Sequence, residues 1–391
     1  MRRHGMKEFV VGNKIATLPI IQGGMGIGIS LANLAAAVAN EGGIGVISAA
    51  GIGMFDWKTK DFNYNNIHGL RTEIKKARAM TDGLLGVNIM VALSNFGDVV
   101  KASIEEGIDY IFAGAGLPLN LPEYINENTT TKLVPIISSG RAAKIITKTW
   151  LRKYDYLPDA FVLEGPEAGG HLGFKIQDLE DPAFHLKKLL PEVLEALLPF
   201  EKDKGKKIPV IVGGGIYDGS DIYYYLNNGA AAVQMATRFV TTDECDASDA
   251  FKQTYIDAKK EDIVIINSPV GLPGRAISNP YLDDVKSGLK HPFKCPYDCI
   301  ITCKKEEAPY CITLALINAK NGKMRNGFAF AGSNAYRSNK IVSVRELINE
   351  LVTGYKQLRY NNIEKYREIK NNYGAIQIRL ESEKEGRYKY R

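Results

Sequence analysis

Eight short apolar runs, rich in β-branched residues, recur through residue 235 and are separated by stretches with helical periodicity. The runs lie at 18–21, 45–48, 86–90, 110–113, 134–137, 161–163, 209–212 and 232–235. Helices are expected at 31–40, 69–80, 98–106, 141–153 and 221–228. Continuous apolar strands that alternate with helices indicate a parallel sheet covered by helices.

Eight such units favour an α/β fold of the (β/α)8 TIM barrel type over residues 1–265. The alternative is a doubly wound sheet that binds a dinucleotide. Residues 23–28 are rich in glycine, as in the motif that binds a dinucleotide, but their spacing differs from G-x-G-x-x-G. In addition, no acidic residue ends the second strand, where it would bind the ribose. We therefore predict the barrel.

The pattern changes after the eighth strand. Residues 266–340 are rich in proline and glycine and are expected to form a smaller, irregular cap with a cysteine-containing insert. The capping box Ser343-Val-Arg-Glu346 predicts the start of a helix. Residues 341–391 are expected to form this C-terminal helix and a charged, partly solvated tail.

Composition places the chain among ordinary globular enzymes, with 45% hydrophobic and 24% charged residues in a total of 391. A net charge of +6 is too modest to indicate nucleic-acid binding. No apolar run reaches membrane-spanning length, and the first residues lack the hydrophobic core of a signal peptide. We therefore expect a cytoplasmic protein that does not enter a membrane.

The active site of such a barrel lies at the carboxyl ends of the strands, often with a phosphate beside strands seven and eight. The loops there read Gly213-Gly-Gly-Ile-Tyr-Asp-Gly219 and Gln234-Met-Ala-Thr-Arg238. Their backbone N–H groups and the Thr237 hydroxyl suit a phosphate. Two tight turns without a ligand are the alternative interpretation.

The loop after the first strand, Gln22-Gly-Gly-Met-Gly26, allows the close approach of a planar group. Asn88 lies within an apolar strand, where its amide needs hydrogen-bonding partners. The edge of a flavin ring offers such partners, and so does a neighbouring loop.

The segment Glu164-Gly-Pro-Glu-Ala-Gly-Gly-His171-Leu-Gly173 carries the clearest catalytic signal. His171 follows two glycines after an apolar strand, so its imidazole is free to reach into a cleft. A side chain that titrates near neutrality suits proton transfer. The alternative is a glycine turn whose histidine only caps a hydrogen bond.

Together these motifs resemble the nitronate monooxygenase family (formerly 2-nitropropane dioxygenases), which includes related flavin-dependent enoyl-acyl-carrier-protein reductases. The resemblance covers about residues 7–350 and depends on the order and spacing of all the motifs. It extends to Ser139 with Lys144, to Ser268-Pro-Val-Gly271 and to Arg275-Ala-Ile-Ser-Asn279.

The resemblance implies FMN bound without a covalent link over the barrel mouth, with His171 as the catalytic residue beside the flavin N5. The cofactor-binding residues that it implies near the ring are Gln22, Gly24, Met25 and Asn88. Those implied near the ribityl phosphate are Gly170, Gly214, Gly215, Gln234, Ala236 and Thr237. Ala236 replaces the glycine usual in the family, which is costly only if its φ is positive.

The implied reaction is the oxidation of alkyl nitronates by O2 to a carbonyl compound and nitrite. An alternative in the same family is an NAD(P)H-dependent flavin reductase that acts on an enoyl-acyl-carrier protein or a quinone. A third alternative is a flavin and metal electron-transfer or partner-binding module that uses the cysteine insert. Both enzyme hypotheses imply a small-molecule substrate. A homodimer is the protein partner that we consider.

Four cysteines, Cys295, Cys299, Cys303 and Cys311, follow the spacing C-x3-C-x3-C-x7-C, with His291 nearby. Since no export signal is present, we do not expect disulfides. The spacing fits no common zinc or iron–sulfur ligand pattern, so we predict a reduced, partly buried lid without a metal. A metal centre remains the alternative.

Overall fold

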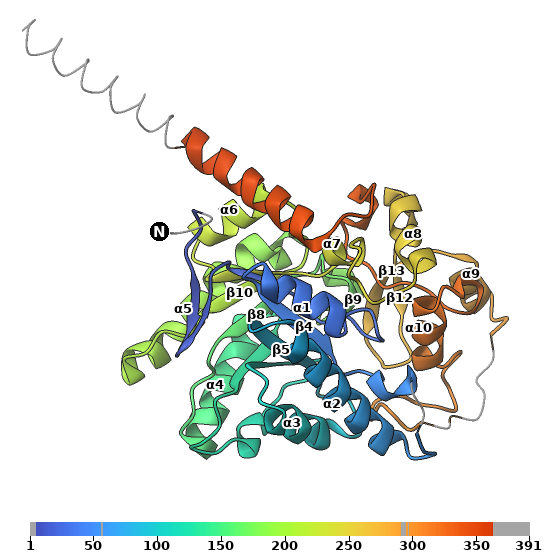
Figure 1. The fold of residues 1–391 in the computed structure, drawn as a ribbon, viewed down its shortest axis with the longest axis horizontal. Helices are drawn as coiled ribbons and strands as arrows, with labels where there is room; N and C mark the ends of the chain where they lie inside the picture. The colour runs from blue at the N-terminus through green and yellow to red at the C-terminus, as the bar shows by residue number, and fades with distance from the viewer. Residues whose placement is uncertain (1–4, 56–57, 291–294, 296, 363–391) are drawn as a thin grey trace, which may run out of the picture.

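The computed structural model describes residues 5–55, 58–290, 295 and 297–362. A closed barrel of parallel strands lies at its centre (Figure 1). Its eight strands are β3 (Ile20–Gln22), β4 (Ile44–Ser48), β5 (Leu84–Met90), β6 (Tyr110–Gly114), β7 (Lys132–Ile137), β8 (Phe161–Glu164), β10 (Val210–Gly213) and β11 (Ala232–Met235). Each predicted apolar run supplies one strand, and the TIM barrel is confirmed.

Helices cover the outside of the barrel (Figure 1). They are α1 (Ala32–Asn40), α2 (Phe62–Met80), α3 (Phe96–Glu105), α4 (Gly140–Tyr154), α5 (Leu186–Lys204) and α6 (Gly219–Asn227). The five predicted helices are confirmed. Helix α5 is not among them, because Pro191 and Pro199 lie inside it and interior prolines remove helical hydrogen bonds. Burial of an apolar face that includes Leu189 and Val193 compensates for those losses.

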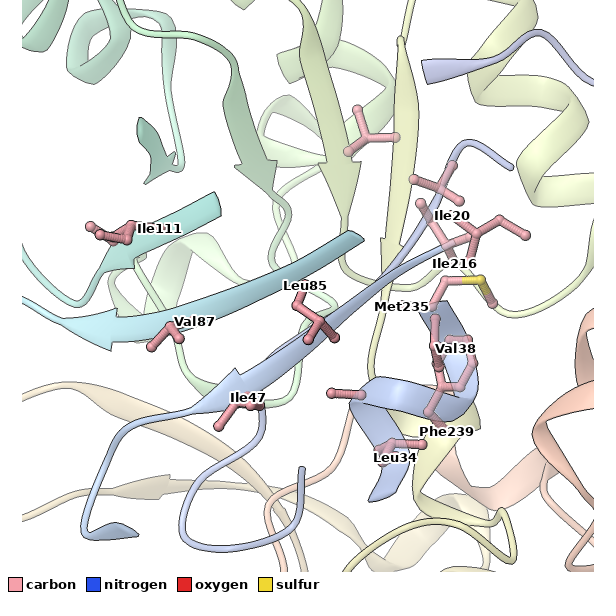
Figure 2. Packing of buried hydrophobic residues seen from close by; sticks show 14 of the residues in the cluster. Ile20, Leu34, Val38, Ile47, Leu85, Val87, Ile111, Ile216, Met235 and Phe239 are labelled. Carbon is pink, nitrogen blue, oxygen red and sulfur yellow. The ribbon is translucent and has the colours of Figure 1, made fainter. Parts of the chain in front are cut away.

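Alternation along the strands divides the core into two clusters. Ile44 and Val46 of β4 belong to the cluster that fills the barrel. Ile47 belongs to the outer cluster, together with Leu34 and Val38 of α1. Figure 2 shows this outer packing between strands and helix.

An N-terminal hairpin closes one end of the barrel. Its strands, β1 (Phe9–Val11) and β2 (Lys14–Ala16), pair antiparallel, and Phe9, Val11 and Ala16 belong to the same cluster as the barrel interior. Because this packing covers the amino-terminal ends of the strands, only the carboxyl ends are available for a ligand.

A second sheet joins the cap segment to the barrel. It consists of β12 (Ile263–Asn267), β13 (Pro273–Ile277) and β9 (Gly170–His171), all paired antiparallel. Strand β9 belongs to the loop after barrel strand β8, so backbone hydrogen bonds tie that loop to the cap. The expected boundary between residues 265 and 266 falls inside β12.

Further helices follow the last barrel strand. They are α7 (Thr237–Val240), α8 (Asp249–Asp257), α9 (Pro280–Lys286) and α10 (Ile312–Lys320). Helices α9 and α10 lie with β12 and β13 on one side of the barrel (Figure 1). The predicted cap is therefore more regular than its proline and glycine content indicates.

The capping box at Ser343 is confirmed. The Ser343 N–H donates to Glu346 Oε2 at 2.8 Å, and the Glu346 N–H donates to Ser343 Oγ at 3.2 Å. The helix that follows occupies residues 344–362. The remaining tail, predicted as a solvated helix, lies outside the described residues. Across the described ranges, no helix combines the length and apolar character needed to cross a membrane.

Candidate active site

A cavity of about 270 Å³ lies at the carboxyl ends of the barrel strands. Residues of the cap segment, among them Phe330 and Ser333, form its other wall. His171 lines the cavity, and so does every predicted cofactor-binding residue except Gln22: Gly24, Met25, Asn88, Gly170, Gly214, Gly215, Gln234, Ala236 and Thr237. Residues from five barrel strands and the loops that follow them thus meet at one place.

His171 is held by contacts with the cap. Its backbone pairs with Gly274 of β13. Its imidazole Nε2 lies 2.8 Å from the hydroxyl oxygen of Ser268, and its ring packs edge-on against Phe330 with the ring centroids 5.0 Å apart. Backbone pairing fixes the position of the residue, and the two side-chain contacts fix the orientation of the ring.

Burial sets the protonation state of His171. Removal of the imidazolium from water lowers its pKa from 6.5 to about 4. The ring is therefore neutral at pH 7 and has a nitrogen lone pair that can accept a proton or a hydrogen bond. A neutral imidazole at a cavity wall suits general base catalysis.

Arg275 stabilises the loop that leads to His171. Its side chain is buried, and Nη1 donates to the carbonyl oxygens of Pro166 at 2.5 Å and Ala168 at 2.7 Å. Sequence analysis identified Arg275 and Ser268 only as parts of motifs. Their roles depend on contacts across about a hundred positions, and no local pattern encodes such contacts.

Glu164 is a titratable group of the cavity to which the sequence assigned no role. It ends barrel strand β8 and lines the cavity. Burial alone raises the pKa of its carboxyl group from 4.5 to about 7. The cavity therefore contains a neutral imidazole and a carboxyl group that exchanges its proton near neutral pH.

Glycines allow the backbone to line the cavity closely. Gly214 and Gly215 have φ values of +94° and +82°, in the left-handed region that favours glycine. A Cβ atom on Gly214 would lie 2.9 Å from the Gly165 carbonyl oxygen, and one on Gly24 would lie 2.3 Å from the Asn88 Cβ. A larger residue at either position would have to displace its neighbours.

The cap contacts the two loops predicted to bind phosphate. The Gly332 N–H donates to Thr237 Oγ1 at 3.0 Å, and Asn334 Nδ2 donates to the Gly215 carbonyl oxygen at 2.7 Å. Between these contacts the Ser333 hydroxyl is buried and lacks a hydrogen-bond partner in the described structure. An oxygen of a bound anion would satisfy it, so this end of the cavity fits a phosphate.

Ala236 does not have the positive φ that would require glycine. Its φ is −120°, outside the left-handed region. The departure from the glycine usual in the family therefore carries no cost of that kind.

Gln22 is not brought to the cavity. Its side chain is fully buried, its Nε2 donates to the Val46 carbonyl oxygen at 3.2 Å, and its Oε1 accepts from the Val46 N–H at 3.0 Å. The amide is used to tie the end of β3 to β4, so it is not available to a ligand. Asn88, by contrast, makes one long hydrogen bond, 3.4 Å to the Phe112 carbonyl oxygen, and lines the cavity.

The four clustered cysteines carry free thiols. Within the described part of the chain, no three histidine, cysteine, aspartate or glutamate side chains are grouped so that they could hold one metal ion. His291, the other residue considered at this site, lies outside the described residues. Cys299 also lines the main cavity.

Comparison with known proteins places the chain in a family. The family model described as nitronate monooxygenase matches residues 8–354. The chain belongs to the nitronate monooxygenase family. Members of this family are oxidoreductases and in general flavin enzymes.

Among sequence relatives, the chain is 30% identical over 272 residues to (3aS,4S,5R,7aS)-5-hydroxy-7a-methyl-1-oxo-octahydro-1H-indene-4-carboxyl-CoA dehydrogenase of Mycobacterium tuberculosis. That match covers 70% of this chain and 66% of the dehydrogenase, just under two thirds of its length. The chain is also 28% identical over 296 residues to a protein of Staphylococcus aureus named "probable nitronate monooxygenase", covering 68% of this chain and 77% of that protein.

A solved structure agrees with the fold. FabK from Thermotoga maritima superposes with a TM-score of 0.67 at 28% identity, covering 90% of this chain and 96% of FabK. The likeness thus includes the cap as well as the barrel.

Proposed function

We propose that this protein binds FMN in the barrel cavity and oxidises alkyl nitronates with O2 to a carbonyl compound and nitrite. The observation that carries the proposal is the neutral imidazole of His171 in a glycine-lined cavity, opposite loops that fit a phosphate. Membership in the nitronate monooxygenase family supports the same reaction.

The residues present fit FMN at both ends of the cavity. Gly214, Gly215 and Thr237, together with the unpartnered hydroxyl of Ser333, would hold the phosphate. At the other end, Gly24 allows a flat ring to approach the backbone, and Asn88 offers amide hydrogen bonds. FMN, when bound, supplies the redox chemistry.

His171 would bind the nitro group of the substrate and, for neutral nitroalkanes, accept the proton from the α-carbon. A neutral ring is needed for that second step, and burial keeps it neutral. Ser268 holds the ring in one orientation, which reduces the reorganisation required when substrate binds.

A second candidate is the NAD(P)H-dependent reduction of an enoyl thioester or a quinone. One observation favours a thioester substrate: a relative with 30% identity is named a carboxyl-CoA dehydrogenase. The apolar cap wall, which includes Ile312, Leu316 and Phe330, also suits an acyl chain.

Anaerobic mixing of the flavin-loaded protein with each reductant tests the two candidates. Bleaching of the flavin by a nitronate, with only slow bleaching by NADH and NADPH, is the expected result. Rapid bleaching by NADH or NADPH, with none by nitronates, would contradict the proposed reaction and show that the protein is an NAD(P)H-dependent reductase. Nitrite measured after readmission of O2 completes the test.

A further inference from the structure

Four of the five cysteines surround a second, smaller cavity. This cavity measures about 30 Å³ and is lined by Cys295, Cys299, Cys303 and Cys311. They lie in the insert that the proposed reaction does not use. A reduced lid would require apolar packing, but it would not require four thiols to face one space.

The two cavities share a wall. Cys299, Ile300, Ile312 and Thr313 line both of them. A group bound among the cysteines would therefore lie next to the site where the barrel binds its cofactor.

Two of the thiols are partly shielded from water by the cap. Cys299 and Cys303 pack against the apolar cluster that contains Tyr310, Ile312 and Phe328.

A hydroxyl group lies beside one of the sulfur atoms. The Cys299 Sγ lies 3.2 Å from Thr313 Oγ1, and either atom can be the donor. Cys311 is the N-cap residue of α10, and its side chain makes no capping hydrogen bond. Hydrogen bonds to sulfur adjust the potential of an iron–sulfur cluster.

A single metal ion does not fit these thiols. In a zinc site the Zn–S distance is about 2.3 Å, which brings four sulfurs within roughly 4 Å of one another. No three ligand-type side chains of the described residues are grouped so that they could hold one metal ion, although four thiols face one cavity. An iron–sulfur cluster is larger than one ion, so its cysteine ligands need not lie that close together.

We propose that Cys295, Cys299, Cys303 and Cys311 bind an iron–sulfur cluster in this cavity. Four cysteine thiolates are the usual ligand set of both two-iron and four-iron clusters. The site does not depend on which reaction the barrel cavity performs.

The test is metal analysis of the full-length protein purified without oxygen. Iron and acid-labile sulfide are expected in equal amounts, at about two to four of each per chain. Reduction with dithionite is expected to produce an electron paramagnetic resonance signal of a reduced cluster. Neither readout requires flavin or catalytic activity.

Two variants and a matched control locate the site. Cys299→Ala and Cys311→Ala are each expected to lower iron and sulfide at least tenfold. Cys245→Ala is the control, because the fifth cysteine is buried in the barrel core and does not line this cavity. If the two variants fail to fold, the analysis of the wild-type protein decides by itself.

Three outcomes would overturn the proposal. The first is wild-type protein with no iron and with four thiols of the insert open to alkylation. The second is about one zinc per chain without sulfide, which would indicate a single-ion site. The third is iron and sulfide that persist unchanged in folded Cys299→Ala and Cys311→Ala.

Discussion

The imidazole Nε2 of His171 lies 2.8 Å from the hydroxyl oxygen of Ser268, although 97 positions separate the two residues. Ser268 lies between β12 and β13, and His171 belongs to β9 of the same sheet. The orientation of the candidate catalytic base is therefore set by the cap and not by the barrel strand that precedes it.

Replacing Ser268 with alanine is expected to lower kcat. The hydrogen bond that orients His171 contributes about 1 kcal/mol, which corresponds to roughly a fivefold change in rate. Steady-state kinetics on a neutral nitroalkane measure the effect. Ser268→Thr, which keeps the hydroxyl, is expected to retain most of the activity, and equal kcat values for all three proteins would show that the contact is not used.

Substitution His171→Ala is expected to separate flavin binding from proton transfer. The protein should stay yellow, since the side chain is not needed to hold a phosphate. Its kcat/KM for neutral nitroalkanes should fall at least about 100-fold, as is typical when a general base is removed. For nitronates, which have already lost the α-proton, the loss should be smaller, and an equal loss on both substrates would contradict a role as base.

The pH dependence of the same step follows from the lowered pKa of His171. A base acts only in its neutral form, and burial keeps this imidazole neutral down to a pKa of about 4. We therefore expect kcat/KM for neutral nitroalkanes to remain constant between pH 8 and about pH 5 and to fall only below that. An acid limb centred at the ordinary histidine pKa of about 6.5 would show that the ring is not desolvated.

Glu164→Gln is expected to change how stability depends on pH. The pKa of the carboxyl group is about 7 in the folded protein, against an ordinary value of 4.5, so the folded state binds the proton more tightly than the unfolded state. The resulting contribution to stability is fully present below pH 4.5 and is lost as the pH rises through 7. The variant should therefore gain stability relative to wild type between pH 4.5 and pH 8, by roughly 2–3 kcal/mol.

Urea unfolding of the flavin-free protein at the two pH values measures that gain. Glu195→Gln, which replaces an exposed carboxylate on α5, is the control. The same free-energy difference between Glu164→Gln and wild type at both pH values would count against a buried carboxyl group.

Gly214→Val is expected to expel FMN. Its Cβ would lie 2.9 Å from the Gly165 carbonyl oxygen, so the loop at the phosphate end would have to move. The flavin-to-protein absorbance ratio after gel filtration should fall to about a tenth or less of the wild-type value.

Gly205→Val controls for backbone strain. Gly205 also has a positive φ, +61°, but a Cβ there meets no atom within 4 Å, and the residue does not line the cavity. Both variants should lose about 1 kcal/mol or more of stability, since both place a side chain in the left-handed region. Equal flavin content in the Gly214→Val and Gly205→Val variants would show that Gly214 does not form part of the phosphate site.

Local patterns were sufficient for the barrel strands and for the glycine-rich loops at its rim. The apolar runs predicted all eight strands because a parallel strand buried on both faces has to be apolar throughout. Glycine-rich segments at the ends of those strands line the cavity as expected, since strand ends of a barrel meet at one rim, while the individual cofactor-binding residues came from the family resemblance. Gln22, which the family resemblance grouped with them, does not line the cavity, because a strand-end residue can also point toward the next strand.

What the sequence alone determined here are features that depend on neighbours along the chain: the eight barrel strands, five of the helices around them, the capping box and the glycine loops. Only the tertiary structure decided which distant groups meet: Ser268 with His171, Arg275 with the loop before it, and four cysteines around one cavity. The physical reason is that hydrogen bonding and burial depend on distance in space. Glu164 illustrates this, because its raised pKa comes from desolvation by residues of the folded barrel and cap.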